Sequence, residues 1–335
     1  MNAKLVIPEL AGVSQDLFDI TSYHRLRHEC GIAVSHALNV GDPSRAGWAY
    51  VALSDSQRRL GDLSSSRESL ENARYSHNLS GDLRGLAWTY WATGNHFRQS
   101  SNYLLADENL KLALDLAKQA RDSRCYVYAL AGIAENSRIR GEYSIALAQH
   151  YRALGWFRRL EDARGVVWAL EGIAQMYKNK GNYGIASRLF RYSASLARMS
   201  GDLRGLGYAL KGLGESTFLA GDPGGLSLVS EAACHFRAMG FAAGALFAEK
   251  TLADLVSAKN VELASELYAQ AAAGFARIQY FRGAAYAHVG LARTLIQLQR
   301  QEEAEILLIN AQRFFRDQRI QYGMSQARGL VNVVR

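Results

Sequence analysis

Aromatic residues recur along this chain at steps of about forty residues, and their types suit ligand binding. From Trp48 onward, each step of 39 or 40 residues again reaches a tryptophan, a tyrosine or a phenylalanine. The aromatic series is Trp48, Trp88, Tyr128, Trp168, Tyr208, Phe247 and Tyr286, and Trp91 adds a further ring. Large rigid aromatic side chains concentrate binding energy at interfaces. The series is therefore predicted either to contact a ligand or to pack between neighbouring structural units.

Two charged or polar series follow the same period, seven and ten residues after each aromatic residue. The first is mostly acid or amide: Asp55, Asn95, Glu135, Gln175, Glu215, Asp254 and Arg293. The second starts with cations and then loses them: Arg58, Arg98, Arg138 and Lys178, followed by Phe218, Ser257 and Ile296. Asp55–Arg58 and Glu135–Arg138 have the spacing of ordinary pairs on a solvated helix face, worth about 0.2–0.5 kcal/mol each. Because the cations stop after the fourth member, we instead expect them to contact a ligand.

No motif in the sequence specifies catalysis. A Gly-x-Ser-x-Gly elbow, a phosphate-binding loop and a His-Glu-x-x-His pair are all absent. His24 and His28 have the i, i+4 spacing of a helical metal pair, but helical histidines more often face solvent or the core. No metal and no cofactor are expected, and the sequence favours a binding protein over an enzyme.

An internal repeat sets the period of all three series. Residues 164–203 carry two apolar stripes with helical spacing, interrupted at Gly181-Asn182, and this pattern predicts a helical hairpin. Variants of the unit open at Arg84, Arg124, Arg164 and Arg204. An aspartate two residues before each opening is placed to cap the next helix: Asp82, Asp122, Asp162 and Asp202. A period of this length indicates a solenoid, in which each unit shares its core with its neighbours.

We therefore expect an all-α solenoid of about seven helical hairpins over residues 44–321, wound into one elongated superhelix. Residues 1–43 are expected to form an N-terminal segment and a partial repeat, with an unpaired helix over about 21–41. Residues 322–335 are expected to form a C-terminal capping helix. One unit departs from the pattern at residues 221–225, where Asp222 is expected to cap a helix that starts at Pro223. The glycines there indicate either a flexible joint or close packing.

The unit resembles the tetratricopeptide repeat, whose characteristic slots read Ile173-Ala174, Tyr177, Gly181, Tyr183 and Ala186 in this chain. The resemblance covers about residues 44–320. It implies helices longer than those of the family's minimal repeat of about 34 residues. It also implies that the aromatic, acid and basic series line a concave groove. The family's terminal proline is missing here, and the fold alone does not specify a ligand.

Net charge and cysteine content limit the partners and the cellular location expected for the protein. The net charge of +8 favours acidic partners without specifying nucleic acid. Three widely spread cysteines, Cys30, Cys125 and Cys234, indicate neither a disulfide framework nor a metal site. A reducing cytoplasm is therefore the expected location. No apolar run is long enough to span a membrane, and nothing indicates an oligomeric state.

The leading prediction is a non-catalytic scaffold that binds an extended peptide or a partner helix in the concave groove. The basic first half is expected to hold acidic groups, and the more apolar second half is expected to hold hydrophobic anchors. The candidate contacts are Trp48, Asp55, Arg58, Trp88, Trp91, Asn95, Arg98, Tyr128, Glu135, Arg138, Trp168, Gln175, Lys178, Tyr208 and Glu215.

Three alternatives stay open. Single-stranded RNA would stack its bases on the aromatic series, although the acid series would repel its phosphates. A bacterial regulator that senses a signal peptide would act through a partner protein, because no DNA-binding segment is evident. A small-molecule enzyme would need an enclosed pocket, which an open groove does not offer.

Overall fold

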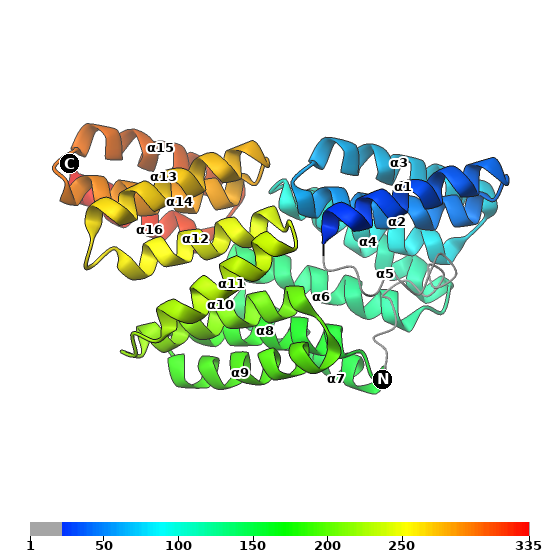
Figure 1. Cartoon of the computed structure of the whole chain (residues 1–335), viewed down its shortest axis with the longest axis horizontal. Helices are drawn as coiled ribbons and strands as arrows, with labels where there is room; N and C mark the ends of the chain where they lie inside the picture. Colours follow the sequence, from blue (N-terminus) through cyan, green and yellow to red (C-terminus); the bar gives the residue numbers. More distant parts are fainter. Residues whose placement is uncertain (1–21, 335) are drawn as a thin grey trace.

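The computed structural model describes residues 22–334, and this part of the chain contains helices and turns without any β-strand (Figure 1). The helices are α1 (Tyr23–Asn39), α2 (Pro43–Leu60), α3 (Leu63–Ser80), α4 (Leu83–Gln99), α5 (Tyr103–Gln119), α6 (Ser123–Arg140), α7 (Tyr143–Arg159), α8 (Ala163–Asn179), α9 (Tyr183–Ser200), α10 (Leu203–Leu219), α11 (Gly225–Ala238), α12 (Ala242–Val256), α13 (Val261–Arg277), α14 (Phe281–Gln297), α15 (Gln301–Asp317) and α16 (Gln321–Val334). Seven hairpins run from α2–α3 to α14–α15, with α1 before them and α16 after them. The predicted all-α solenoid is confirmed.

The expected entry segment, residues 1–20, lies outside the described residues. Among the helices that the structure describes, none is long and apolar enough to cross a membrane.

The repeating aspartates cap helices and also join successive hairpins. One oxygen of Asp122 accepts the amide hydrogen of Cys125 at 2.9 Å, which caps the first turn of α6. Its other oxygen accepts the indole N–H of Trp88 at 2.8 Å and the guanidinium Nε of Arg84 at 2.9 Å, both from the preceding hairpin. Although burial raises the pKa of Asp122, these hydrogen bonds lower it below its usual value. Asp122 therefore fixes the angle between the second hairpin and the third.

The same arrangement recurs one repeat earlier and one repeat later. Asp82 caps α4 and accepts the indole N–H of Trp48 at 2.9 Å. Asp162 caps α8 and lies 3.3 Å from the Tyr128 hydroxyl, which donates to it. Part of the aromatic series is thus a structural link between repeats.

Close approach of the helices depends on rings that lie against glycine. A Cβ atom placed on Gly212 of α10 would overlap the ring of Phe190 from α9, and one on Gly165 of α8 would overlap Phe157 from α7. Both phenylalanines are buried. Glycine is required at these places because any larger residue would push the two helices apart.

Histidine replaces phenylalanine in two earlier repeats. His150 lies on Gly172, forty residues before the Phe190–Gly212 pair, and His77 lies on Gly85, eighty residues before Phe157–Gly165. Both imidazoles are fully buried, and burial lowers the pKa of each to about 4.

The superhelix closes on itself, which corrects the expectation of an elongated solenoid. The amide of Tyr23, at the start of α1, donates to the Met239 carbonyl oxygen at 2.9 Å, and the Arg282 amide donates to Ser101 Oγ at 3.0 Å. Figure 1 shows α12–α16 lying beside α1–α5. The expectation was wrong because one repeat encodes its contact with the next repeat, whereas closure depends on rotation summed over all seven.

The irregular stretch at residues 221–225 is a close contact. A Cβ on Gly214 would lie 2.5 Å from the Gly225 carbonyl oxygen, and a Cβ on Gly225 would in turn overlap the Gly214 carbonyl. This favours the packing interpretation over a flexible joint. The helix begins at Gly225 rather than at the predicted Pro223, with Gly224 as its N-terminal cap residue.

The first prediction tests the aspartate link. Asp122→Ala removes both a helix cap and the charge-assisted bonds to the preceding hairpin, and we expect a loss of about 2–4 kcal/mol in the free energy of unfolding. Asp42→Ala is the matched control, because Asp42 caps α2 through the Arg45 amide and receives no bond from an aromatic residue of a preceding hairpin among the described residues. It should cost about 1 kcal/mol. Equal losses in urea denaturation would contradict the linking role.

The second prediction concerns acid stability. Burial lowers the pKa of His150 in the folded chain to about 4, whereas in the unfolded chain its pKa is near the ordinary value of 6.5. Folded stability is therefore lost as the pH falls through this range, at up to about 1.4 kcal/mol per pH unit. His150→Phe introduces the phenylalanine that the next repeat has at this position. We expect the free energy of unfolding near pH 7.5 to change little. Between pH 6 and 4.5 the variant should become more stable than the wild type. Thermal melts whose difference stays constant with pH would contradict this.

Candidate functional site: the central cavity

Closure turns the predicted concave groove into an internal cavity of about 1070 Å³. The first helix of every hairpin contributes to its wall, together with α1 and α16. Thirteen of the fifteen candidate residues line the cavity: Asp55, Arg58, Trp91, Asn95, Arg98, Tyr128, Glu135, Arg138, Trp168, Gln175, Lys178, Tyr208 and Glu215. The open groove expected from the sequence is thus replaced by a partly enclosed site.

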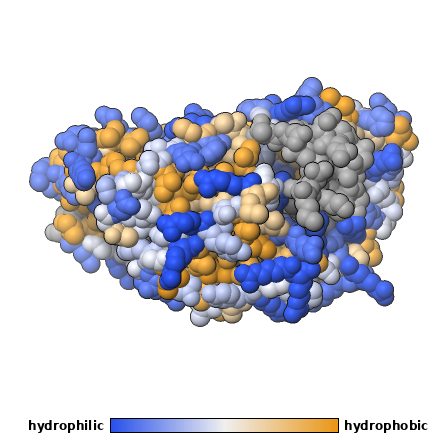
Figure 2. All heavy atoms as spheres, turned by 60° about the horizontal axis from the view of Figure 1, so that its bottom comes forward, coloured by the Kyte–Doolittle hydropathy of each residue, from blue (hydrophilic) through white to orange (hydrophobic). Residues whose placement is uncertain are grey.

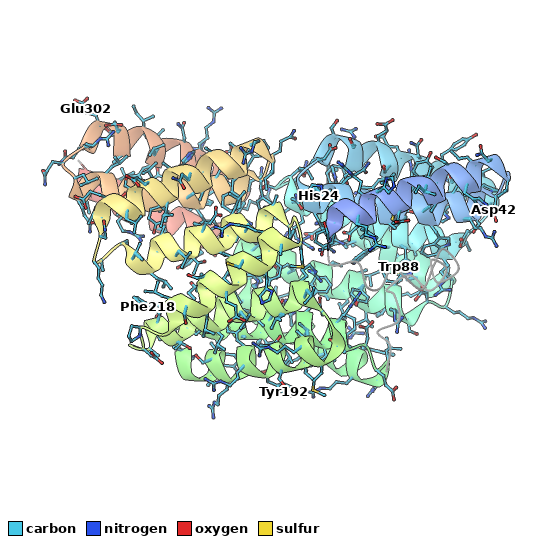
Figure 3. All side chains as sticks on the ribbon, in the orientation of Figure 1. His24, Asp42, Trp88, Tyr192, Phe218 and Glu302 are labelled. Atoms are coloured by element: carbon cyan, nitrogen blue, oxygen red, sulfur yellow. The ribbon has the colours of Figure 1, made fainter. Side chains whose placement is uncertain are left out.

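Trp48 and Trp88 do not line the cavity. Their side chains are buried, at 3% and 0% exposure, and their indole nitrogens are held by Asp82 and Asp122. Figure 3 shows Trp88 among the helices of the N-terminal half. For these two residues the structure supports the structural interpretation of the aromatic series.

The aromatic wall of the cavity is made of Trp91, Tyr128 and Trp168. The Trp168 ring stacks on Tyr128 with centroids 5.9 Å apart and 27° between the planes, and Trp91 meets Tyr128 edge-on at 5.7 Å. Trp168 makes no bond to Asp202 like the one that Trp88 makes to Asp122, within the described residues. The Arg98 guanidinium lies 5.9 Å from the Trp168 ring centroid. Trp168 is therefore the tryptophan of the periodic series that faces the cavity.

The predicted acid and basic series do form pairs, but not on a solvated face. Arg138 bonds Glu135 at 2.6 Å, and both side chains are less than one-fifth exposed. Burial alone raises the pKa of Glu135, yet Arg138 outweighs it and holds the pKa at about 2. Lys178 bonds Glu215 from the next repeat at 2.5 Å. These pairs are expected to contribute more than exposed pairs, because little water screens them.

Positive charge continues through the second half of the cavity, where hydrophobic anchors were expected. Lys211, Lys250, Arg282 and Arg293 line this half. Most were missed because they do not belong to the two periodic series that begin with Asp55 and Arg58. A third series, three residues after each aromatic, contains two of them, Lys211 and Lys250. The whole series is Val51, Trp91, Ala131, Glu171, Lys211, Lys250 and Val289.

Several cavity groups have shifted pKa values. Burial raises the pKa of Glu171 well above its usual value, and one of its carboxyl oxygens has no partner among the described residues. Burial lowers the pKa of Lys211 to about 8, and burial raises the pKa of the Cys30 thiol to about 12. A thiol with so high a pKa stays protonated and is a poor nucleophile.

The described residues contain no group of three or more metal-ligating side chains. His24 and His28 both lie exposed on α1. His24 instead lies where α1 meets the chain near Gly240, and a Cβ on that glycine would be 3.0 Å from the imidazole (Figure 3).

No family model and no curated protein matches this sequence. Solved structures are similar in fold. The structure of a Rap protein complexed with competence and sporulation factor has 16% identity and a TM-score of 0.65, over 98% of this chain and 97% of that chain. NprR in complex with its cognate peptide NprX has 14% identity and a TM-score of 0.56, over 93% and 98%.

A third similar structure is the Cut9–Hcn1 hetero-tetramer, with 14% identity and a TM-score of 0.60, over 98% of this chain and 55% of that chain. At these identities the likeness concerns the fold alone. The chain therefore has the tetratricopeptide-type helical solenoid fold that its repeats predicted.

The third prediction separates the two kinds of tryptophan. Trp88→Ala should cost about 3–5 kcal/mol of unfolding free energy, because it leaves a cavity in the core and frees Asp122 from its indole partner. Trp168→Ala should cost clearly less, since the ring already faces a cavity. Urea denaturation followed by circular dichroism measures both, and equal losses would assign Trp168 to the core.

Proposed function

We propose that this protein is a non-catalytic scaffold that binds an extended peptide with acidic groups in its central cavity. The observation that carries the proposal is the charge of the wall: eleven lysines and arginines line the cavity against six aspartates and glutamates. In a partly enclosed site, such an excess of cations attracts and orients an acidic ligand.

The size and lining of the cavity support a peptide rather than a small metabolite. Pockets for drug-sized ligands measure about 300–1,000 Å³, and this cavity reaches the top of that range. The aromatic wall of Trp91, Tyr128 and Trp168 offers flat apolar surface for peptide side chains, and the indole N–H of Trp91 is buried without a partner among the described residues.

The chemistry of the wall favours binding over catalysis. An enclosed cavity removes one objection to a small-molecule enzyme, but a nucleophile with an adjacent base is the usual requirement for group transfer. Cys30 is kept protonated by burial. Most cavity carboxylates are held by neighbouring cations: Asp55, Glu135, Glu215 and Asp254.

A peptide-sensing regulator is the more specific form of this proposal. Two proteins of the same fold, the Rap protein and NprR, were solved with competence and sporulation factor and with the cognate peptide NprX, and each matches this chain over more than nine-tenths of both lengths. That likeness supports a signal peptide as the ligand, with the response passed to a partner protein. A cytoplasmic location stays a prediction from the three cysteines.

RNA binding is the less favoured alternative. The acid series reaches into the cavity at Asp55, Glu135 and Glu215, and these carboxylates would repel a phosphate backbone.

The fourth prediction tests the peptide proposal. Immobilised protein is incubated with a random pool of free-acid heptapeptides, and retained peptides are identified by mass spectrometry. We expect enrichment of sequences with Asp or Glu, and loss of that enrichment in Trp168→Ala. A mixed single-stranded oligonucleotide, offered in parallel at physiological salt, should bind only weakly and non-specifically.

The control removes apolar groups from the outer surface. Tyr192 and Met199 of α9 are exposed, and Figure 3 shows Tyr192 at the outer edge of the molecule. Figure 2 shows hydrophobic patches among hydrophilic side chains on one face of the molecule. The double variant Tyr192→Ser, Met199→Ser should retain the same peptides. Enrichment that survives Trp168→Ala and disappears in the outer-surface variant would assign binding to the outer face and overturn the proposal.

A further inference from the structure

The closure of the superhelix rests partly on a contact between the turn that follows α4 and the start of α14. We call this contact the seam and define it by Ser101, Tyr103, Tyr280 and Arg282. The Arg282 amide donates to Ser101 Oγ at 3.0 Å across 181 positions of sequence. Tyr103 is 2% exposed and packs in one apolar cluster with residues of α14–α16. The seam therefore joins the second hairpin to the seventh.

Two arginines lack an acidic partner: Arg282, which belongs to the seam, and Arg98, which lies three residues before Ser101. In the described part of the chain, neither Arg98 nor Arg282 has a carboxylate within ion-pair distance, although Arg58 and Arg138 each do. Arg98 donates one N–H to Asn95, and its Nη1 is buried without a partner. Arg282 donates Nη2 to the Tyr280 hydroxyl at 2.9 Å, and its Nε is buried without a partner.

Buried guanidinium N–H groups without partners are costly, since each has lost its water without gaining a protein acceptor. Such groups are satisfied best by a planar oxyanion, which accepts two parallel hydrogen bonds from one guanidinium. Packing holds both arginines in place. The Arg282 guanidinium lies 5.3 Å from the Phe247 ring centroid and 5.5 Å from that of Tyr280, while Arg98 lies beside Trp168.

The two arginines meet through Ser101. The Ser101 hydroxyl oxygen accepts the Arg282 amide hydrogen at 3.0 Å, and the Ser101 amide donates to the Arg98 carbonyl oxygen at 3.2 Å. Arg98 and Arg282 both act electrostatically on Tyr103: burial raises the pKa of Tyr103 to about 12, and both guanidinium groups oppose that rise. Tyr280, which accepts a hydrogen bond from Arg282, is also within electrostatic range of Arg98. Arg98, Tyr280 and Arg282 all line the central cavity.

We propose that a carboxylate of the bound peptide is held jointly by Arg98 and Arg282, so that the ligand links α4 to α14 and stabilises the closed superhelix. This inference rests on the proposed peptide-binding function and specifies how the ligand is anchored. A singly charged carboxylate fits better than a phosphate dianion, because Glu135 also acts on Arg98 and adds negative charge at this place. The carboxylate comes from the peptide C-terminus or from an Asp or Glu side chain.

Linkage gives this anchor a structural consequence. A ligand that binds only when the second and seventh hairpins are together must favour the closed form over any form in which the seam is apart. Ligand binding and the geometry of the superhelix are thereby coupled through one ion pair. A partner protein that recognises the outer surface of the closed superhelix would in this way respond to the peptide.

The fifth prediction identifies the anchoring group with four heptapeptide pools: free acids or amides, each with or without Asp and Glu. The pool that contains both kinds of carboxylate should be enriched on the protein, together with at least one of the two pools that contain a single kind, and the pool without a carboxylate should not. Enrichment from the free acids without Asp and Glu assigns the terminal carboxylate; enrichment from the amides with Asp and Glu assigns a side chain. Comparable enrichment from the carboxylate-free pool would overturn the inference and leave peptide binding intact. Enrichment from no pool would overturn the proposed function and this inference together.

The residues are tested with the strongest peptide from these pools. Arg98→Gln and Arg282→Gln should each weaken its affinity by about 30-fold or more. Arg237→Gln is the matched control, because it removes the same charge from an exposed side chain paired with Glu249 outside the cavity, and it should leave affinity unchanged. If a glutamine variant fails to fold by circular dichroism, a lysine at the same position keeps the charge and removes the planar fork.

Replacing the peptide's anchoring carboxylate by an amide completes a double-mutant cycle between Arg282 and the peptide. The change should cost the wild type about 30-fold and should cost the Arg282→Gln variant little, because both changes remove the same interaction. Independent, additive losses would overturn the inference.

The seam itself is followed by the distance between spin labels. Glu68 on α3 and Gln270 on α13 are exposed, and cysteines are placed at both after Cys234→Ser removes the exposed thiol. The peptide should narrow the distance distribution in the wild type and leave it unchanged in Arg282→Gln. An unchanged distribution in the wild type at saturating peptide would overturn the stabilisation of closure.

Discussion

The hydrogen bonds that converge on the capping aspartates set how the first four hairpins are arranged against one another. Asp122 caps α6 with one oxygen and holds Trp88 and Arg84 of the preceding hairpin with the other. A helix cap alone fixes where a helix begins, whereas this second set of bonds fixes how one hairpin is rotated against the next. Because the link recurs at Asp82 and Asp162, the rotation recurs as well. A superhelix of defined pitch follows from a local bond repeated at intervals of forty residues.

Glycine sets how closely the helices approach. Phe190 on Gly212 and Phe157 on Gly165 bring helix axes nearer than two side chains would allow. Close approach and regular rotation together bring the seventh hairpin back to the second, where Arg282 meets Ser101. The enclosed cavity is a consequence of this closure. Nothing in one repeat requires it, since each repeat contacts only its neighbours.

Enclosure changes the chemistry of the groove residues. On an open surface, Glu135 and Arg138 would be a weak solvated pair, but inside the cavity their attraction outweighs burial and keeps the carboxyl ionised. Cations without carboxylate partners, Arg98 and Arg282, are left to a ligand. Burial also raises the pKa of Glu171 and favours its neutral form, because Arg204 and Lys211 oppose this rise without outweighing it. The cavity wall therefore contains both paired charges, such as Glu135–Arg138, and arginines without a carboxylate partner, which a ligand could bind.

The sequence by itself determined everything that repeats: the hairpins, their caps, the tetratricopeptide-type fold and part of the cavity wall. Thirteen of fifteen candidate residues face the cavity because residues seven and ten positions after each aromatic share one face of their helix. Only the tertiary structure decided what depends on non-local contact. It buried Trp48 and Trp88 against Asp82 and Asp122, and it brought the Arg282 amide to Ser101, which closes the groove. Those outcomes escape a repeat pattern because they arise from packing between distant hairpins, which helical spacing does not encode.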